Sequence, residues 1–242
     1  MTLPPMSPLT LPEMLLALYL LLVLPAQAIR HSRQPPRNRP RMAMYLSNIT
    51  RLVLLLLALA ACALWSGYTA QQMGVAWPPG TAGQWGLAAA VAGVAALVVA
   101  GELYERRMSP EKRAKSDAEM LERKEMPTTL RELAVFAVLA VLIGVGWELL
   151  YRGFLLLVLA PVTGTAGAVT LAALAYGAGH GYNGWKPFIA SMVAAFAFTL
   201  AYVWTGSLWW LMVIHTAAPL GAGWSVYRKN VARNGGALTV TR

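Results

Sequence analysis

Charged residues are scarce in this chain, and acidic residues are scarcer still. Asp, Glu, Lys and Arg make up 12% of the 242 residues, against 57% hydrophobic residues. Between Glu132 and the C-terminus, Glu148 is the only acidic residue. Cys62 is the only cysteine, which excludes an intrachain disulfide and a cysteine-based metal cluster. This composition is typical of an integral membrane protein and excludes an ordinary soluble domain.

Long apolar runs recur along the chain, and each is long enough to cross a bilayer as a helix. They predict an all-α, polytopic membrane helix bundle of about seven transmembrane helices. The predicted spans are 11–29, 49–69, 83–104, 132–159, 165–182, 187–204 and 207–226. We divide the chain into an N-terminal part with three spans (1–131), a core (132–226) and a basic tail (227–242).

The connections between the spans predict the orientation. The first, "RHSRQPPRNRPR", carries five arginines and no acid, and the tail from residue 227 carries four basic residues. The segments 70–82, 160–164 and 205–206 contain neither Lys nor Arg. By the positive-inside rule the N-terminus lies outside and the C-terminus lies in the cytoplasm. The net charge of +10 is therefore assigned to topology, with the lipid bilayer and not nucleic acid as the partner.

The third connection, residues 105–131, alternates in the sign of its charges. Glu111 and Lys115, and likewise Glu119 and Arg123, are four residues apart, as in a solvated helix with paired charges. Pro127 is expected to separate this helix from the fourth span. The first span ends in "PAQAIR", but its basic residues follow the apolar run, so we expect a retained span and not a signal peptide.

The fourth span contains "GVGWELLYRGFLLL", in which Glu148 and Arg152 lie on one helical face. Charged groups at this depth cost several kcal/mol and usually face the interior of a bundle. A buried ion pair that locks two helices is one explanation. His180, at the end of a Gly/Ala-rich span, and His215, inside the last span, add a second explanation. A carboxylate and two imidazoles on three helices can activate water, or bind a divalent metal such as zinc through His180 and His215.

Three segments of the core resemble, in order, the motifs of the CPBP family, also called Abi or CAAX-protease-like intramembrane endopeptidases. They are "WELLYRGFL", "YGAGHGYNGW" and "TGSLWWLMVIHTAAP". The family pattern is Glu-Glu-x-x-x-Arg, then Phe/Tyr-x-x-x-His, then His-x-x-x-Asn. The resemblance covers residues 132–226 and implies an intramembrane endopeptidase that acts on membrane-associated peptides or proteins, in a bacterial plasma membrane.

The resemblance assigns roles to individual residues. Glu148 falls on the second glutamate, Arg152 on the arginine, and His180 and His215 on the two histidines, all four as catalytic residues. Tyr176 falls on the aromatic position, and Tyr151 adjoins the motif; both would shape the site. Two positions depart from the pattern. Trp147 replaces the first glutamate, which the family uses to activate water, and Pro219 replaces the asparagine.

The two departures leave the activity open. Indole offers only an N–H donor, and proline has neither an amide side chain nor a backbone N–H. Glu148 could act as a substitute base or support the histidines. The alternatives are a catalytically inactive scaffold or binding protein of the same fold, and a small transporter with a proton relay, although no inverted repeat is found.

The depth of the residues poses a separate problem. Glu148 lies about 24 Å along its helix from Leu133, whereas His180 lies near the end of its span. We expect the fourth helix either to begin before the membrane or to break at residues 144–146.

Overall fold

The computed structural model describes residues 9–34 and 39–239, with side chains up to residue 234. The described residues form helices and no strand. Arg37 of the first basic connection and Arg242 of the tail lie outside the described residues. The helices are α1 (Leu11–Leu18), α2 (Leu24–Ser32), α3 (Arg41–Ser66), α4 (Thr81–Arg107), α5 (Pro110–Leu121), α6 (Leu130–Glu148), α7 (Leu156–Ala178), α8 (Trp185–Thr205) and α9 (Trp209–Thr239), with π-helical segments η1 (Tyr19–Val23) and η2 (Leu149–Leu155).

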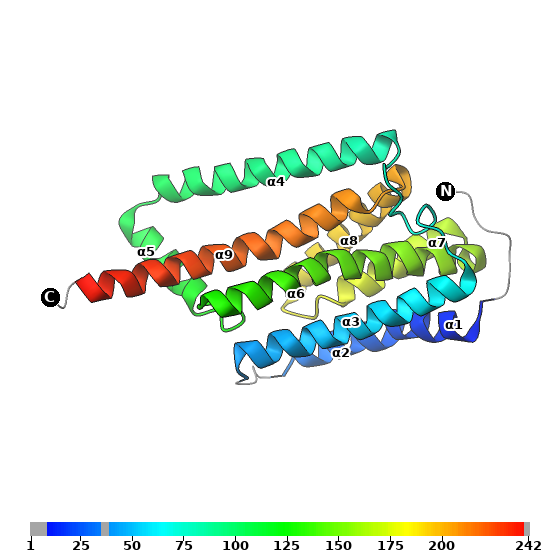
Figure 1. Cartoon of the computed structure of the whole chain (residues 1–242), viewed down its shortest axis with the longest axis horizontal. Coiled ribbons are helices and arrows are strands. Elements are labelled where there is room, and N and C mark those ends of the chain that lie inside the picture. The colour runs from blue at the N-terminus through cyan, green and yellow to red at the C-terminus, as the bar shows by residue number, and fades with distance from the viewer. Residues whose placement is uncertain (1–8, 35–38, 240–242) are drawn as a thin grey trace.

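The long helices run roughly parallel to one axis, as an elongated bundle (Figure 1). α4, α9, α6 and α3 lie side by side in that order, and α9 packs on both α4 and α6. α7 packs on α8 and on α2. The core is made of leucine, alanine and aromatic side chains from α2, α3, η2, α7 and the start of α9. This arrangement confirms the predicted all-α membrane bundle.

Five described helical segments are long and apolar enough to cross a membrane. The longest, Leu130–Ala178, has 49 residues and contains two passes, because the chain turns back within it at Gly164. Gly164 has φ 72°, a left-handed conformation that costs glycine nothing and other residues energy. α9, which lies between α4 and α6, is not among these five segments, and its predicted membrane crossing stays a prediction.

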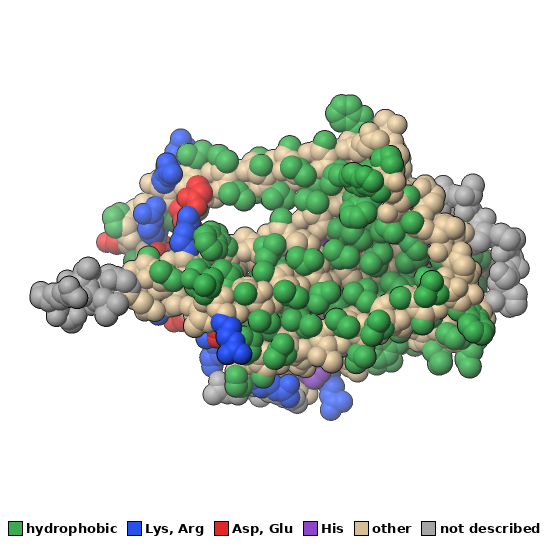
Figure 2. Space-filling view, in the orientation of Figure 1, with side chains coloured by type: hydrophobic (Ala, Val, Ile, Leu, Met, Phe, Trp, Pro, Cys, Tyr) green, Lys and Arg blue, Asp and Glu red, His purple; other side chains and the backbone are tan. Residues whose placement is uncertain are grey.

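Charge and apolar surface are separated along the bundle. Figure 2 shows Lys and Arg side chains gathered toward the end where α4 and α6 approach α5, whereas hydrophobic side chains cover the middle. Exposed side chains such as Leu57, Leu97 and Trp204 belong to this apolar surface. The separation supports an integral membrane protein with the basic end outside the lipid core. That this end is the cytoplasmic one remains a prediction.

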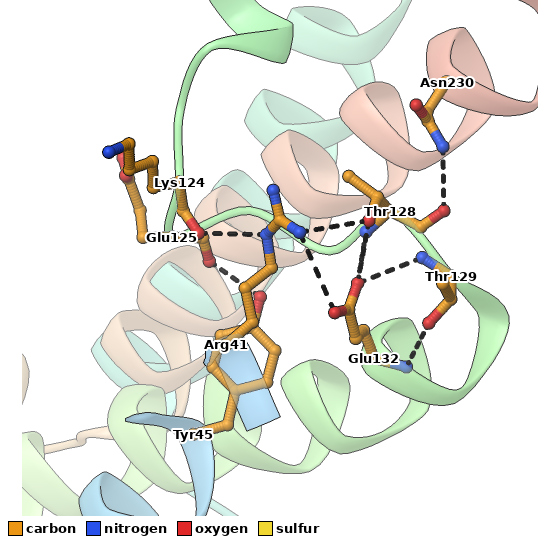
Figure 3. Close-up of polar contacts among 8 residues, drawn as sticks. All are labelled: Arg41, Tyr45, Lys124, Glu125, Thr128, Thr129, Glu132 and Asn230. Carbon is orange, nitrogen blue, oxygen red and sulfur yellow. Dashed lines mark hydrogen bonds and ion pairs between the residues drawn. The ribbon is translucent and has the colours of Figure 1, made fainter. Parts of the chain in front are cut away.

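A polar cluster at the basic end fixes the start of α6 (Figure 3). Thr129 caps the helix, since its Oγ1 accepts a hydrogen bond from Glu132 N at 3.2 Å. Glu132 Oε2 in turn accepts from the backbone of Thr128 and Thr129, at 2.8 and 3.1 Å. Arg41 at the start of α3 donates to Lys124 O and Thr128 Oγ1, at 3.0 and 3.3 Å. The cluster therefore ties α3 to α6 before either helix enters the apolar region.

The two ion pairs expected within the third connection, residues 105–131, need correction. The helix predicted within 105–131 exists as α5, but the ion pairs formed by the described residues do not include Glu111 with Lys115 or Glu119 with Arg123. Instead Asp117 pairs with Lys229 of α9 at 2.5 Å. Lys229 also pairs with Glu105 at 2.9 Å. A partner on a packed helix offers shelter from water that a neighbour on the same exposed face does not.

Candidate active site

The carboxylate of Glu148 is fully buried at the end of α6. Its exposed fraction is 0%, and that of Arg152, one turn later in η2, is 1%. Arg152 Nη1 donates to Glu148 Oε1 and Oε2 at 2.6 and 2.7 Å. The pair predicted from the sequence spacing is therefore present, and it lies within one continuous helix.

His215 on α9 adds a third group to this pair. Its Nδ1 lies 2.6 Å from Glu148 Oε1, within ion-pair distance, and among the described residues this buried nitrogen has no partner in hydrogen-bond geometry. Nδ1 is buried close to the carboxylate, and His215 is among the residues that line a neighbouring cavity. A carboxylate that accepts from Nδ1–H leaves a lone pair on Nε2, which is the atom able to take a proton.

Arg152 connects the site to α7 and α8. Its Nε donates to Thr199 Oγ1 at 3.2 Å, and Thr199 Oγ1 donates to Ala195 O at 2.7 Å. The guanidinium carbon lies 4.5 Å from the centre of the Tyr176 ring, a cation–π contact in a buried setting. Arg152 thus has partners on three helices, and it holds Glu148 in one position.

The aromatic residues of the motifs form a chain of ring contacts, some edge-to-face and some tilted. The Tyr176 ring lies 5.2 Å from Tyr151, 5.1 Å from His180 and 6.1 Å from His215. Tyr151 also contacts Trp147, and its hydroxyl donates to Leu20 O at 2.9 Å. The Tyr176 ring therefore contacts both histidines, and its role in shaping the site stays a prediction.

His180 lies just after the end of α7, with Nδ1 3.0 Å from Tyr176 O. This contact again leaves Nε2 as the free acceptor. The depth problem is solved by the turn at Gly164, because Glu148 precedes it by 16 residues and His180 follows it by 16 residues. At about 1.5 Å per residue, both residues lie about 24 Å from that turn.

The break expected at residues 144–146 is not present, since α6 is continuous there. These glycines instead let helices approach closely. A Cβ on Gly144 would lie 2.6 Å from Thr216 N, and one on Gly146 would lie 3.1 Å from Leu52. The irregularity comes later, in the π-helical η2, a kind of segment that is frequent at functional sites. Close contact with α9 brings His215 to Glu148.

A cavity of about 360 Å³ adjoins these residues. His180, His215, Tyr151 and Tyr176 line it, and so do the two departures from the family pattern, Trp147 and Pro219; the remaining lining residues are Leu24, Ala28, His31, Arg51, Ile143, Gly179 and Ala218. Glu148 and Arg152 are buried and are not among the lining residues. α9 stays helical through Pro219.

Two of the lining residues that were not predicted from the sequence have basic side chains. His31 at the end of α2 and Arg51 in α3 come from the N-terminal spans, which the motif resemblance does not reach. Arg51 carried a signal that could have identified it. It is followed by 50 residues, 52–101, without any Asp, Glu, Lys or Arg, so its charge borders an apolar run.

The metal site considered from the sequence does not fit the donors. Among the described residues, no group of three or more His, Cys, Asp or Glu side chains is placed to hold a metal ion. The Nδ1 atoms of His180 and His215 face a carbonyl oxygen and Glu148. A cation beside Glu148 would also lie next to the Arg152 guanidinium, and the two like charges would repel each other.

Comparison with known proteins gives one result. Residues 129–220 match the family described as type II CAAX prenyl endopeptidase Rce1-like. No curated protein and no solved structure matches the chain. The matched segment begins at the cap of α6, ends just after Pro219, and contains Glu148, Arg152, His180 and His215. Through this segment the core of the chain is similar to the CAAX-protease-like, or CPBP, family of membrane proteins.

Proposed function

We propose that this protein is an intramembrane endopeptidase of the CAAX-protease-like type, in which His215 is the base that activates water. The observation that carries the proposal is the 2.6 Å contact between His215 Nδ1 and Glu148 Oε1. A buried carboxylate behind an imidazole fixes the ring's tautomer and stabilises the imidazolium that forms when the ring takes a proton. Glu148, fully buried and bonded by Arg152, supports the base and is not itself the base.

The reaction follows from this arrangement. A water molecule in the cavity donates hydrogen bonds to Nε2 of His215 and of His180. As its oxygen attacks the peptide carbonyl, one proton passes to His215. His215 then gives that proton to the departing amine, so the C–N bond breaks and the base is regenerated. Trp147 contributes an indole N–H donor to the cavity wall but no base.

A specific observation favours a second candidate, an inactive relative that binds membrane peptides. Trp147 and Pro219 both line the cavity, at the two positions where the family pattern has a glutamate and an asparagine. The first replacement removes a base, and the second removes an amide able to stabilise the oxyanion. If His215 does not compensate for these losses, the cavity still retains the shape and polarity of a binding site.

A cleavage assay separates the two candidates. Purified protein in lipid nanodiscs is incubated with a library of quenched fluorescent peptides, beside His215→Ala, His180→Ala and Glu148→Gln. Glu102→Gln, an exposed acid on α4, is the matched control. Cleavage that is lost in the three site variants and kept in the control supports the proposal. Unchanged cleavage in His215→Ala contradicts it.

Two further arms sharpen the result. A wild type that cleaves nothing, with activity appearing after Trp147→Glu and Pro219→Asn together, indicates an inactive relative on an intact fold. Cleavage should also persist in the presence of a chelator, because the proposed base is an imidazole. Loss of cleavage with chelator, restored by added zinc, contradicts the metal-free mechanism.

A further inference from the structure

Arg51 is a charged residue of the cavity wall that the proposed reaction does not use. It lies in α3, ten residues after the helix begins at Arg41, and its side chain lines the cavity together with His31 of α2. The hydrogen bond that fixes it runs from Nη2 to Gln27 Oε1 at 2.7 Å. Gln27 is a neutral side chain, so this bond orients the guanidinium without neutralising it.

No carboxylate compensates the charge of Arg51. Within the described part of the chain, none lies within ion-pair distance of it, and none lines the cavity. Glu148 is already bonded to Arg152 and His215. An arginine carries its charge at every physiological pH, and a charge within a membrane span normally has a partner. Arg51 therefore gives one wall of the cavity a positive charge that an anionic ligand would complete, and His31 lines the same cavity.

We propose that Arg51, with Gln27 and His31 beside it, forms an anion-binding subsite of the cavity that takes a carboxylate of a bound peptide. That the ligand is a peptide rests on the proposed function. The anion preference rests only on the cavity. Carboxylate is the anion that a peptide carries, either at its C-terminus or on an acidic side chain, and the planar guanidinium binds it with two parallel hydrogen bonds.

The position of the subsite suits a ligand that also reaches the histidines. His31 comes from α2 and Arg51 from α3, whereas His215 comes from α9 and His180 from the end of α7. These residues line the same cavity of about 360 Å³. A peptide held by its carboxylate at Arg51 would thus extend toward the imidazoles, and the subsite would select ligands by charge before any chemistry.

A lipid phosphate is the competing source of negative charge. Arg51 also borders an open groove on the outer side of α3, lined by Tyr19, Ser47 and Thr50. A phospholipid in that groove could reach the guanidinium from outside. The cavity side is favoured because His31 lines the cavity and does not line the groove. The experiment must still separate the two sources.

Peptide binding provides the test, in a His215→Ala background that removes the proposed base. One fluorescent peptide is prepared with a free C-terminal carboxylate, as its amide, and as an amide with one internal Asp. Binding to nanodiscs of zwitterionic lipid is measured for the background and for Arg51→Gln, Arg51→Lys and Gln27→Met. Arg30→Gln, an exposed arginine near the same end of α2, is the matched control. Phospholipid retained through purification is counted by native mass spectrometry.

The background should bind one of the two carboxylate peptides about tenfold or more tightly than the plain amide. Arg51→Gln should abolish that preference, Arg51→Lys should keep part of it, and Arg30→Gln should leave it unchanged. Tighter binding of the peptide with a free C-terminus would identify the bound group as the terminal carboxylate, and tighter binding of the peptide with Asp would identify it as an acidic side chain. If Arg51→Gln does not fold, a reduced preference in Gln27→Met carries the test.

Three outcomes overturn the proposal: equal binding of all peptides to the background, an unchanged preference in Arg51→Gln, or loss of bound anionic phospholipid from Arg51→Gln with an unchanged peptide preference. Cleavage is measured separately on the protein with His215 intact. A carboxylate preference without cleavage would remove the endopeptidase proposal and leave the subsite standing. Cleavage without any carboxylate preference would remove the subsite and leave the endopeptidase proposal standing.

Discussion

At the scale of single residues, Glu148 is held by partners on its own helix and on α9. Breaking a buried ion pair by removing one partner leaves the other charge uncompensated, which costs far more than the net stabilisation by the pair. This asymmetry applies strongly here, because both Glu148 and Arg152 are excluded from solvent. Their role can be measured through stability, independently of any activity.

Glu148→Gln or Arg152→Met alone should lower the free energy of unfolding by about 3–5 kcal/mol, whereas the double variant should lose clearly less than the sum. Thermal unfolding in nanodiscs measures the three variants. The exposed pair Glu102 and Arg228, 2.8 Å apart, is the control, and its variants should change stability by about 1 kcal/mol or less. Additive losses at Glu148 and Arg152 would contradict the coupling.

The sequence predicted the residues of this centre better than it predicted the cavity wall. Spacing of four along a helix determined the contact between Glu148 and Arg152, and the motif order indicated the histidines. Arg51 was missed because hydropathy measures how apolar a segment is and not what its side chains face. The contact of His215 with Glu148 Oε1 was also beyond the sequence, since it depends on how closely α9 approaches α6.

At the scale of elements, the close approach of α6 and α9 decides whether His215 reaches Glu148. Gly144 permits this approach, since a Cβ there would lie 2.6 Å from Thr216 N and 2.8 Å from Thr216 Cα. Both atoms belong to the backbone, so no side-chain movement relieves the contact. The helix pair must shift as a unit if Gly144 is replaced.

Gly144→Ala should separate α6 from α9 and weaken the contact between His215 and Glu148, with lower stability and lost cleavage. Gly93→Ala on α4 is the matched control, because its Cβ would meet no atom within 4 Å. In that open position alanine should stabilise the helix by up to about 1 kcal/mol. Thermal unfolding and the cleavage assay give both readouts. Wild-type behaviour of Gly144→Ala would show that the helices are not held at contact distance.

The elements themselves followed largely from sequence, because a span needs only length and apolar composition. The turn at Gly164 fell in the uncharged segment predicted between two spans. The π-helical η2 was not predictable, since π and α segments of this length have the same composition. The partners of α5 were predicted wrongly because the local rule of spacing four ignores residues more than 100 positions away, such as Lys229 for Asp117.

At the scale of the whole molecule, the basic end is held together by contacts between α5 and α9. Partial burial lowers the pKa of Lys229, but the hydrogen bonds to Asp117 and Glu105 outweigh it and raise the pKa above its usual value. A raised pKa stabilises the folded state below the unfolded pKa, and this contribution disappears as pH rises through the folded value. The contact should therefore hold through the neutral range and weaken only in strong alkali.

Lys229→Met should lower the melting temperature at pH 8, and the difference from the wild type should shrink at pH values above about 10.5, the ordinary pKa of lysine. Arg233→Met, in the exposed part of the same helix, serves as the control. A difference that stays constant between pH 8 and pH 11 would show that the charge of Lys229 is not what stabilises the contact.

The orientation of the bundle can be tested with the chain's single cysteine. Cys62 is buried and should not react with a membrane-impermeant thiol reagent in intact cells. In a Cys62→Ala background, Gln71→Cys should be labelled from outside, and Ser109→Cys should be labelled only after the cells are opened. The reverse pattern would invert the predicted topology.

The location of Arg152 on the same helix as Glu148 has a consequence for biosynthesis. The chain enters the membrane from its N-terminus, so the helix that contains Glu148 is inserted before α8 and α9 have been made. Because its counter-ion lies one turn away, the carboxylate is neutralised while those later helices are still absent. The helix can therefore remain inserted in the bilayer before α8 and α9 are present. At the end of synthesis, α9 needs to supply only an imidazole. A partner arginine on α9 would have left each helix to insert with an isolated charge.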